Sequence, residues 1–143
     1  MSYKDLLKAR PADIIPPKPI PPGPFKVRIA SHEFSTAGKK NTECVNFSLR
    51  LLEPGDEVDP DLLEAAKDDL AKAKPTHRVF ITEDSLWVLR GFLSNVLKIP
   101  EADSLEEMMP QTTGKEFIAI FTQQPSERDK ERMVSFIEKV LPL

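Results

Sequence analysis

Hydrophobic and polar residues alternate in several stretches of the chain, a period of two that is typical of half-buried β-strands. From Phe25 to Ile29 every second residue is apolar, and residues 45–51 repeat the pattern. The segment between them, residues 35–41, is polar, contains a glycine and two lysines, and is interpreted as a loop. The pattern predicts a hairpin of two long strands joined by a basic loop.

Strand character returns further along the chain. Residues 76–82 are β-branched and aromatic, and residues 114–124 alternate again. The last segment, residues 131–143, fits a helix by its spacing and a strand by its composition, so both interpretations stay open.

Helical spacing of apolar residues marks two segments. Residues 59–74 have an acidic first turn, which suits a helix dipole, and residues 82–99 form the stronger helix, with Thr82 or Asp84 as its cap. Residues 1–10 are predicted to form a short helical turn. The apolar stripe of the stronger helix consists of Leu86, Leu89, Phe92, Leu93, Val96 and Leu97.

Six prolines fall within residues 16–24. Because proline lacks an amide donor, residues 11–24 are predicted to be polyproline II rather than helix. Such an arm can lie along a sheet edge and deliver Phe25 in register at little entropic cost. A weaker alternative is that residues 18–24 are a basic-x-x-Pro-x-x-Pro ligand for an aromatic-lined groove, a pattern that arises easily by chance.

Charge is segregated along the chain. The net charge is −3, but residues 53–69 hold eight acidic groups against one lysine, which leaves 19 basic and 15 acidic groups elsewhere. The remainder of the chain is therefore basic, and the overall figure conceals it.

Several classes of protein do not fit the sequence. The single cysteine, Cys44, has no thiol partner, and His32 and His77 lack spaced partners, so neither a disulfide framework nor a metal site is expected. No apolar run approaches membrane-spanning length, and the first ten residues lack the core of a signal peptide. A cytoplasmic protein without cofactors is expected.

The predicted order is strand, strand, helix, strand, helix, strand and a final element. This is the order of a five-stranded OB-fold barrel, so we expect a mainly β fold with a helix after strand three and an inserted acidic helix between strands two and three. At 143 residues one domain is expected. We assign residues 1–24 to a proline-rich arm and residues 25–143 to the OB-fold domain, with the insert at 53–75.

Three stretches support a resemblance: PPGPFKVRI at 21–29, TEDSLWVLRGFL at 82–93, and GKEFIAIFTQQ with the residues that follow it, 114–142. Together they resemble the OB-fold single-stranded-DNA-binding proteins of bacteriophages. The resemblance implies sequence-neutral binding of single-stranded DNA during phage replication or recombination, in the cytoplasm of the infected bacterial host. Replication or recombination proteins are implied as further partners, and monomer and dimer both stay open.

Three departures from that family stand out, one of which is the helical spacing of the last segment, because it leaves the fifth strand of the barrel open. The acidic helix at 59–74 resembles an insertion. The chain ends in VLPL without the acidic tail by which many such proteins recruit partners, so that function is absent or the tail lies beyond this sequence.

Binding a single strand requires cations for phosphates and flat aromatic rings for bases. OB folds present this surface chiefly on strands two and three and neighbouring loops. Lysines and arginines on the outward faces of strands could be present only for solubility. As a set, however, they lie on the strand faces opposite the core. The candidate DNA-binding residues are Lys26, Arg28, Lys39, Lys40, Asn46, Arg50 and Arg78, with Phe80 and Phe34 for stacking.

Other aromatic residues are assigned to the core. Phe47 and Phe117 share parity with apolar neighbours, and Phe80 could also be buried, because a short strand can be apolar on both faces. Trp87 could act as a stacking platform for a base, but its position in an apolar helix favours a role in closing the end of the barrel.

The acidic insert has two interpretations. The default is an amphipathic helix that packs Leu62, Leu63, Ala66 and Leu70 on the barrel. The alternative is that its charge mimics DNA, either masking the binding groove or docking a basic partner.

Two other functions compete with DNA binding. No nucleophile with a base, phosphate-binding glycine loop or metal motif is visible, so the chain is not expected to be an enzyme. An OB-fold module that recruits replication or recombination partners instead of DNA stays open, because OB barrels also bind proteins.

Overall fold

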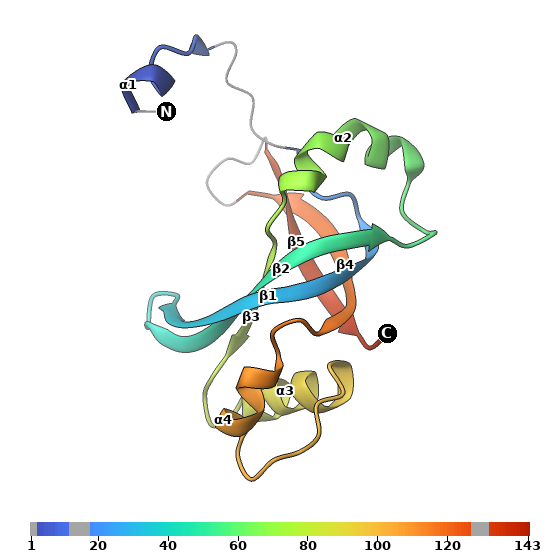
Figure 1. Cartoon of the computed structure of the whole chain (residues 1–143). Helices are drawn as coiled ribbons and strands as arrows, with labels where there is room; N and C mark the ends of the chain where they lie inside the picture. Colours follow the sequence, from blue (N-terminus) through green and yellow to red (C-terminus); the bar gives the residue numbers. More distant parts are fainter. Residues whose placement is uncertain (1–2, 12–17, 127–131) are drawn as a thin grey trace.

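The computed structural model describes residues 3–11, 18–126 and 132–143, and there the protein is mainly β. Five antiparallel strands form one sheet in the order β3-β2-β1-β4-β5 (Figure 1). The strands are β1 (Gly23–Ala37), β2 (Thr42–Pro54), β3 (Thr76–Phe80), β4 (Glu116–Pro125) and β5 (Met133–Leu141).

The predicted hairpin is present as β1 and β2, but its loop is shorter than expected. Residues 35–37 belong to β1, so the turn is confined to residues 38–41. Gly38 and Asn41 both have positive φ there, as a tight turn requires. The last segment, which the sequence left undecided, is the strand β5, paired along β4.

Four α-helices accompany the sheet in the described residues. The two predicted long helices are α2 (Pro60–Lys72) and α3 (Leu86–Gly91), which continues as the π-helical turn η2 (Phe92–Val96). Asp59 caps α2 by accepting a hydrogen bond from the Asp61 amide at 2.9 Å. The remaining helical elements are α1 (Tyr3–Leu6), α4 (Leu105–Met108) and the 3₁₀ turn η3 (Met109–Gln111).

Neither predicted cap of the stronger helix is confirmed, because Ser85 and not Thr82 or Asp84 is the N-cap of α3, and Ser85 forms no side-chain capping hydrogen bond. Thr82 instead closes the turn that precedes the helix. Its hydroxyl accepts from the Ser85 amide at 3.2 Å, and the Ser85 hydroxyl accepts from the Thr82 amide at 3.0 Å.

The helix α4 was not predicted, although the sequence carries a signal for it. Leu105, Met108 and Met109 have helical spacing, and Ser104 caps the helix by accepting a hydrogen bond from the Glu107 amide at 3.3 Å.

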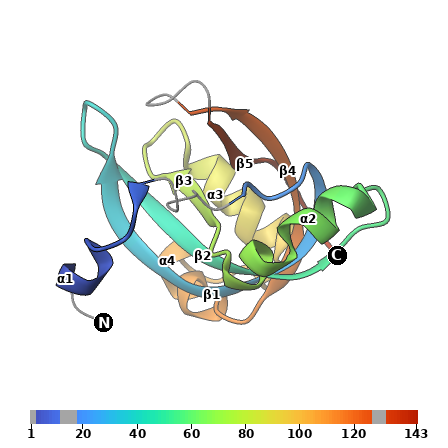
Figure 2. The same cartoon turned by 90° about the horizontal axis from the view of Figure 1, so that it is seen from above.

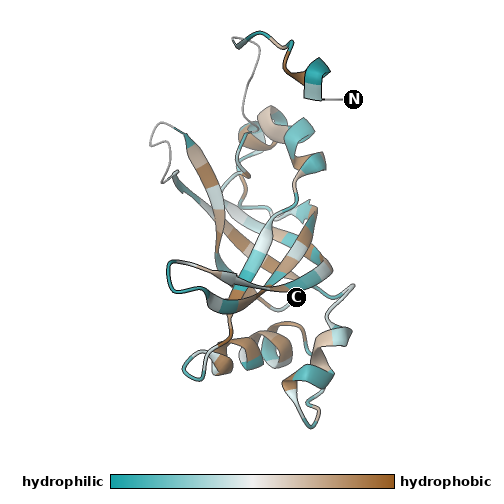
Figure 3. Cartoon of the chain, turned by 90° about the vertical axis from the view of Figure 1, so that its left-hand side faces the viewer, coloured by the Kyte–Doolittle hydropathy of each residue, from teal (hydrophilic) through white to brown (hydrophobic). Residues whose placement is uncertain are grey.

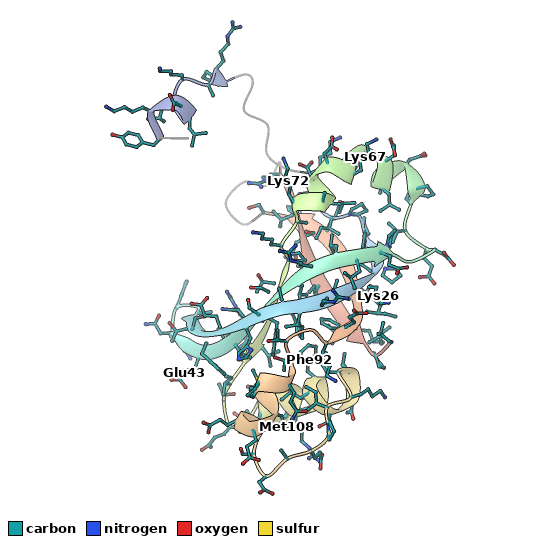
Figure 4. All side chains as sticks on the ribbon, in the orientation of Figure 1. Lys26, Glu43, Lys67, Lys72, Phe92 and Met108 are labelled. Carbon is teal, nitrogen blue, oxygen red and sulfur yellow. The ribbon has the colours of Figure 1, made fainter. Side chains whose placement is uncertain are left out.

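The core lies between the curved sheet and its helices. In Figure 1, α2 covers one end of the sheet and α3 and α4 cover the other, while Figure 2 shows the strands curving around the interior. Figure 3 shows hydrophobic and hydrophilic residues alternating along the strands. Phe47 and Phe117 are fully buried, as predicted, and Phe92 reaches them from the helical layer (Figure 4).

The predicted role of Trp87 is wrong. Its side chain is 73 % exposed, whereas Leu89 two residues later is buried. A step of two residues in an α-helix turns the side chain through about 200°, so only one of the two can face the sheet. The helix packs through Leu89 and Phe92, which leaves Trp87 on its outer side.

The acidic insert packs as an amphipathic helix. Ala66 is buried and Leu63 and Leu70 pack against the core, whereas Leu62 stays exposed on the surface. Val58, just before the helix, is also buried. The helix is thus part of the fold, although Asp61, Glu64 and Asp68 remain exposed.

The chain is anchored before it enters β1. The Lys18 amide donates to the Asp69 carboxylate at 3.0 Å, and the Ile20 carbonyl accepts from Gln123 Nε2 at 3.0 Å. Ile20 and Pro21 are buried. The end of the proline-rich segment therefore holds β1 against α2 and β4, while residues 12–17 of the predicted polyproline segment lie outside the described residues.

Gly23 allows the chain to pass from the proline-rich segment into β1. Its φ of +128° is strained for any residue with a side chain, and an added Cβ would stand 2.8 Å from Val58 Cγ2. We expect Gly23→Ala to lower the free energy of unfolding by about 2–3 kcal/mol, from backbone strain and the displaced Val58. Chemical denaturation measures this change.

Gly114→Ala is the matched control. Gly114 also has positive φ, at +87°, but nothing lies within 4 Å of an added Cβ. It should therefore lose only about 1 kcal/mol, the cost of backbone strain alone. Equal losses in the two variants would show that the contact with Val58 contributes nothing.

Candidate nucleic-acid interface

Side chains of β1, β2 and β3 that point away from the core form one surface, here called the outer face. The register places Asn46 of β2 between Glu33 of β1 and Arg78 of β3. Further along β2, Arg50 pairs with Arg28 of β1. Three predicted arginines and the predicted asparagine therefore share one surface.

Arg78 is held in place by a network across the three strands. Its Nε donates to Asn46 Oδ1 at 2.9 Å, and Asn46 Nδ2 donates to Ser35 Oγ at 2.7 Å. The network uses only Nε, and within the described residues no further hydrogen bond of the guanidinium is found. Its two terminal nitrogens are the atoms that bind a phosphate in a bidentate manner.

Lys26 and Arg28 already have an acidic partner. Lys26 Nζ lies 3.3 Å from Glu116 Oε1, and Arg28 donates to Glu116 Oε2 through Nε at 3.0 Å and Nη2 at 2.6 Å. The hydrogen bond from Arg28 is the main reason that the pKa of Glu116 is lowered. A phosphate would have to replace this carboxylate, so these two cations contribute less to phosphate affinity than unpaired cations would.

Arg50, Lys39 and Lys40 are exposed and form no ion pair within the described residues. The two lysines occupy the β1–β2 turn, beyond the sheet, where they can reach a backbone that crosses the outer face. Arg50 and Asn46 are four residues apart on β2, which separates Arg50 from the Arg78 site by about 13 Å.

Phe80 and Phe34 lie on opposite faces of the sheet, so they cannot stack on the same strand of DNA. Phe80 pairs with Cys44 on the outer face and is 42 % exposed. Phe34 pairs with Val45, whose side chain is buried in the core. The cause is a β-bulge at Ala30, which shifts the alternation of β1 by one residue.

Glu33 is an acidic group on the outer face that the sequence analysis did not weigh. It lies beside Asn46, in the same row as Arg78. The bulge that moves Phe34 inward is also what turns Glu33 outward, so only knowledge of the bulge could have revealed it. Its charge opposes phosphate binding at this point.

A second basic surface was also missed. A cleft of about 580 Å³ lies along the edges of β3 and β5. Lys74, Arg132 and Phe136 line it, and Asp69 is the acidic residue in its lining. The signal in the sequence was the run of lysines that ends the insert, which was obscured by the acidic charge of the insert as a whole. Lys18 and Lys72 complete its basic lining.

The described residues contain neither a candidate metal site nor a helix that could span a membrane. In the described ranges no group of three potential metal ligands occurs. None of the helices described is long and apolar enough to cross a membrane. Neither protein-family models nor curated proteins match the sequence. Function must therefore be inferred from the residues and their geometry.

His77 lies beneath the outer face, among core aromatic rings. Its ring centroid is 4.9 Å from that of Phe92 and 6.3 Å from that of Phe117. Burial lowers the pKa of His77 to about 4 from the usual 6.5. The unfolded chain therefore binds a proton at a higher pH than the folded chain does.

This difference predicts acid sensitivity. The stability associated with neutral His77 is complete above pH 6.5 and is lost as the pH falls towards about 4. The total loss is about 3 kcal/mol at 1.36 kcal/mol per pKa unit. Urea unfolding at a series of pH values should show a smaller loss for His77→Leu than for the unaltered protein. Parallel curves would contradict the predicted titration.

Proposed function

We propose that the protein binds single-stranded DNA without sequence preference and that the outer face of β1, β2 and β3 is the binding surface. The observation that carries the proposal is that Arg28, Arg50 and Arg78 lie on one face of the sheet, with Phe80 in the row next to Arg78. Cations beside an exposed aromatic ring are what binding of phosphates and bases requires.

We propose further that the sheet is an OB-type barrel. Its central strand β1 pairs with both β2 and β4, and β3 and β5 are the edge strands. In an OB barrel the first strand has these same two neighbours, and the third and fifth strands meet to close the barrel. The outer face then corresponds to the surface that OB folds use for oligonucleotides.

In this proposal the cations have different roles. Arg78 is oriented by Asn46 and presents its terminal nitrogens, so it binds a phosphate at a fixed place. Arg50 neutralises a second phosphate, and Lys39 and Lys40 close over the backbone from the turn. Phe80 stacks on a base. Lys26 and Arg28 bind a phosphate only when it displaces the Glu116 carboxylate from them.

The cellular role follows from the resemblance to phage proteins. The protein would protect and straighten single strands during phage DNA replication or recombination, in the cytoplasm of the infected bacterium. No part of this mechanism requires catalysis or a cofactor.

A protein-interaction module is the second candidate. An apolar groove beside α3 and α4 favours it, since Phe34 and Leu86 are exposed there. Salt distinguishes the two functions, because phosphate binding weakens steeply with salt and an apolar interface does not.

The arginines can be tested together. We expect Arg50→Ala with Arg78→Ala to weaken binding of labelled oligo-dT and to reduce the slope of log affinity against log salt by about 1.4, because two phosphate contacts are lost and each contributes about 0.7 on a single strand. Fluorescence anisotropy over a range of salt concentrations measures both effects.

The matched control is Lys67→Ala with Lys98→Ala, which removes the same charge from exposed helical and loop positions. Its slope should stay unchanged. An unchanged slope in the arginine variant would place the phosphates elsewhere, with the basic cleft between β3 and β5 as the next surface to change.

Stacking can be separated from charge. Phe80→Ala should weaken binding by about 1–3 kcal/mol without changing the salt slope, because a base contact releases no counterions. Phe34→Ala removes an equally large and more exposed ring from the opposite face, and should leave DNA affinity unchanged. The same anisotropy titration measures both variants, and equal effects would show that the outer face is not the binding surface.

A further inference from the structure

An apolar groove opens where the distal half of the β1–β2 hairpin meets α3 and α4. Its volume is about 390 Å³. Phe34 is 58 % exposed and Leu86 is 40 % exposed, although both are large apolar residues. This is the core-facing side of the hairpin, so the groove does not overlap the outer face. Its apolar lining is completed by Ile81, Leu89, Leu105, Met109 and Pro110.

The N-terminal helix α1 carries a matching apolar face. Tyr3, Leu6 and Leu7 are spaced at i, i+3 and i+4, which places them on one side of a helical turn. The Leu7 amide donates to the Tyr3 carbonyl at 2.9 Å, so the turn extends to Leu7. All three side chains are at least 60 % exposed, and α1 buries no residue.

The two surfaces are complementary in charge. Residues 3–11, which include α1, carry Lys4, Lys8 and Arg10 against one acid, Asp5. The groove has Glu106 in its lining, and the helices around it add further acidic residues. These are Glu83 and Asp84 before α3, and Glu107 on α4.

We propose that the apolar groove of one molecule receives α1 of a second copy. Lys18 is fixed to α2 by hydrogen bonds to Asp69 and to the Ala65 carbonyl, so the arm leaves the body at the α2 end. The groove lies at the other end, beside α3 and α4 (Figure 1). An arm that departs from one end and a groove at the other generate a head-to-tail contact between copies.

The test is sedimentation velocity of the full chain without DNA, with concentrations up to the order of millimolar because a contact of this size is weak. The unaltered chain should associate as its concentration rises, and added salt should weaken association. In the arm variant, Tyr3, Leu6 and Leu7 are replaced by serine. In the groove variant, Phe34→Ser is combined with Leu86→Ser. Each should weaken association about tenfold or more.

A mixture of the two variants is the decisive measurement. The arm variant retains an intact groove and the groove variant retains an intact arm, so an equal mixture should form one-to-one pairs that neither variant forms alone. Leu52→Ser with Leu62→Ser is the control, because it removes two exposed leucines outside the groove and should not alter association. Thermal unfolding confirms that each variant is folded.

Three results would overturn the proposal. The first is a chain that stays monomeric at every concentration, which includes the case of an arm lying on its own groove. The second is association that persists in both variants. The third is a mixture that forms no pairs although the unaltered chain associates.

Discussion

The β-bulge at Ala30 determines how the rest of the molecule is arranged. Before it, β1 pairs with β4 on one side and β2 on the other, and Val27 and Ile29 point into the core. After it, β1 pairs with β2 alone, and the inward positions move to His32 and Phe34. One extra residue thus divides β1 into a half that builds the sheet and a half that projects as a hairpin.

The projecting hairpin consequently has two chemically different faces. Its outer face carries the network that orients Arg78 through Asn46, and it is polar and basic. Its inner face carries Phe34 above helices α3 and α4, and it is apolar. Because the faces are opposite, a nucleic acid on one and a helix of a second copy on the other could be bound at the same time.

The sequence predicted those elements and buried residues that depend on local periodicity. The β1–β2 hairpin, both long helices and the burial of Phe47 and Phe117 follow from patterns of two or 3.6 residues. Phe34 was placed wrongly beside Phe80 because a bulge interrupts such a pattern without a distinct sequence signal. The orientation of Trp87 depended on which side of α3 packs on the sheet, and only tertiary structure determines that.

The arrangement of charges also shows why the candidate cations are unequal. Glu116 offsets Lys26 and Arg28, so a phosphate arriving there replaces an existing attraction instead of adding one. Arg78, by contrast, is bound only to a neutral amide, which fixes its geometry without neutralising its charge. A neutral partner lowers the entropic cost of ordering the side chain, and the whole attraction to a phosphate is retained. Affinity for a phosphate backbone should therefore be concentrated on the β2–β3 side of the outer face and should decrease towards β4.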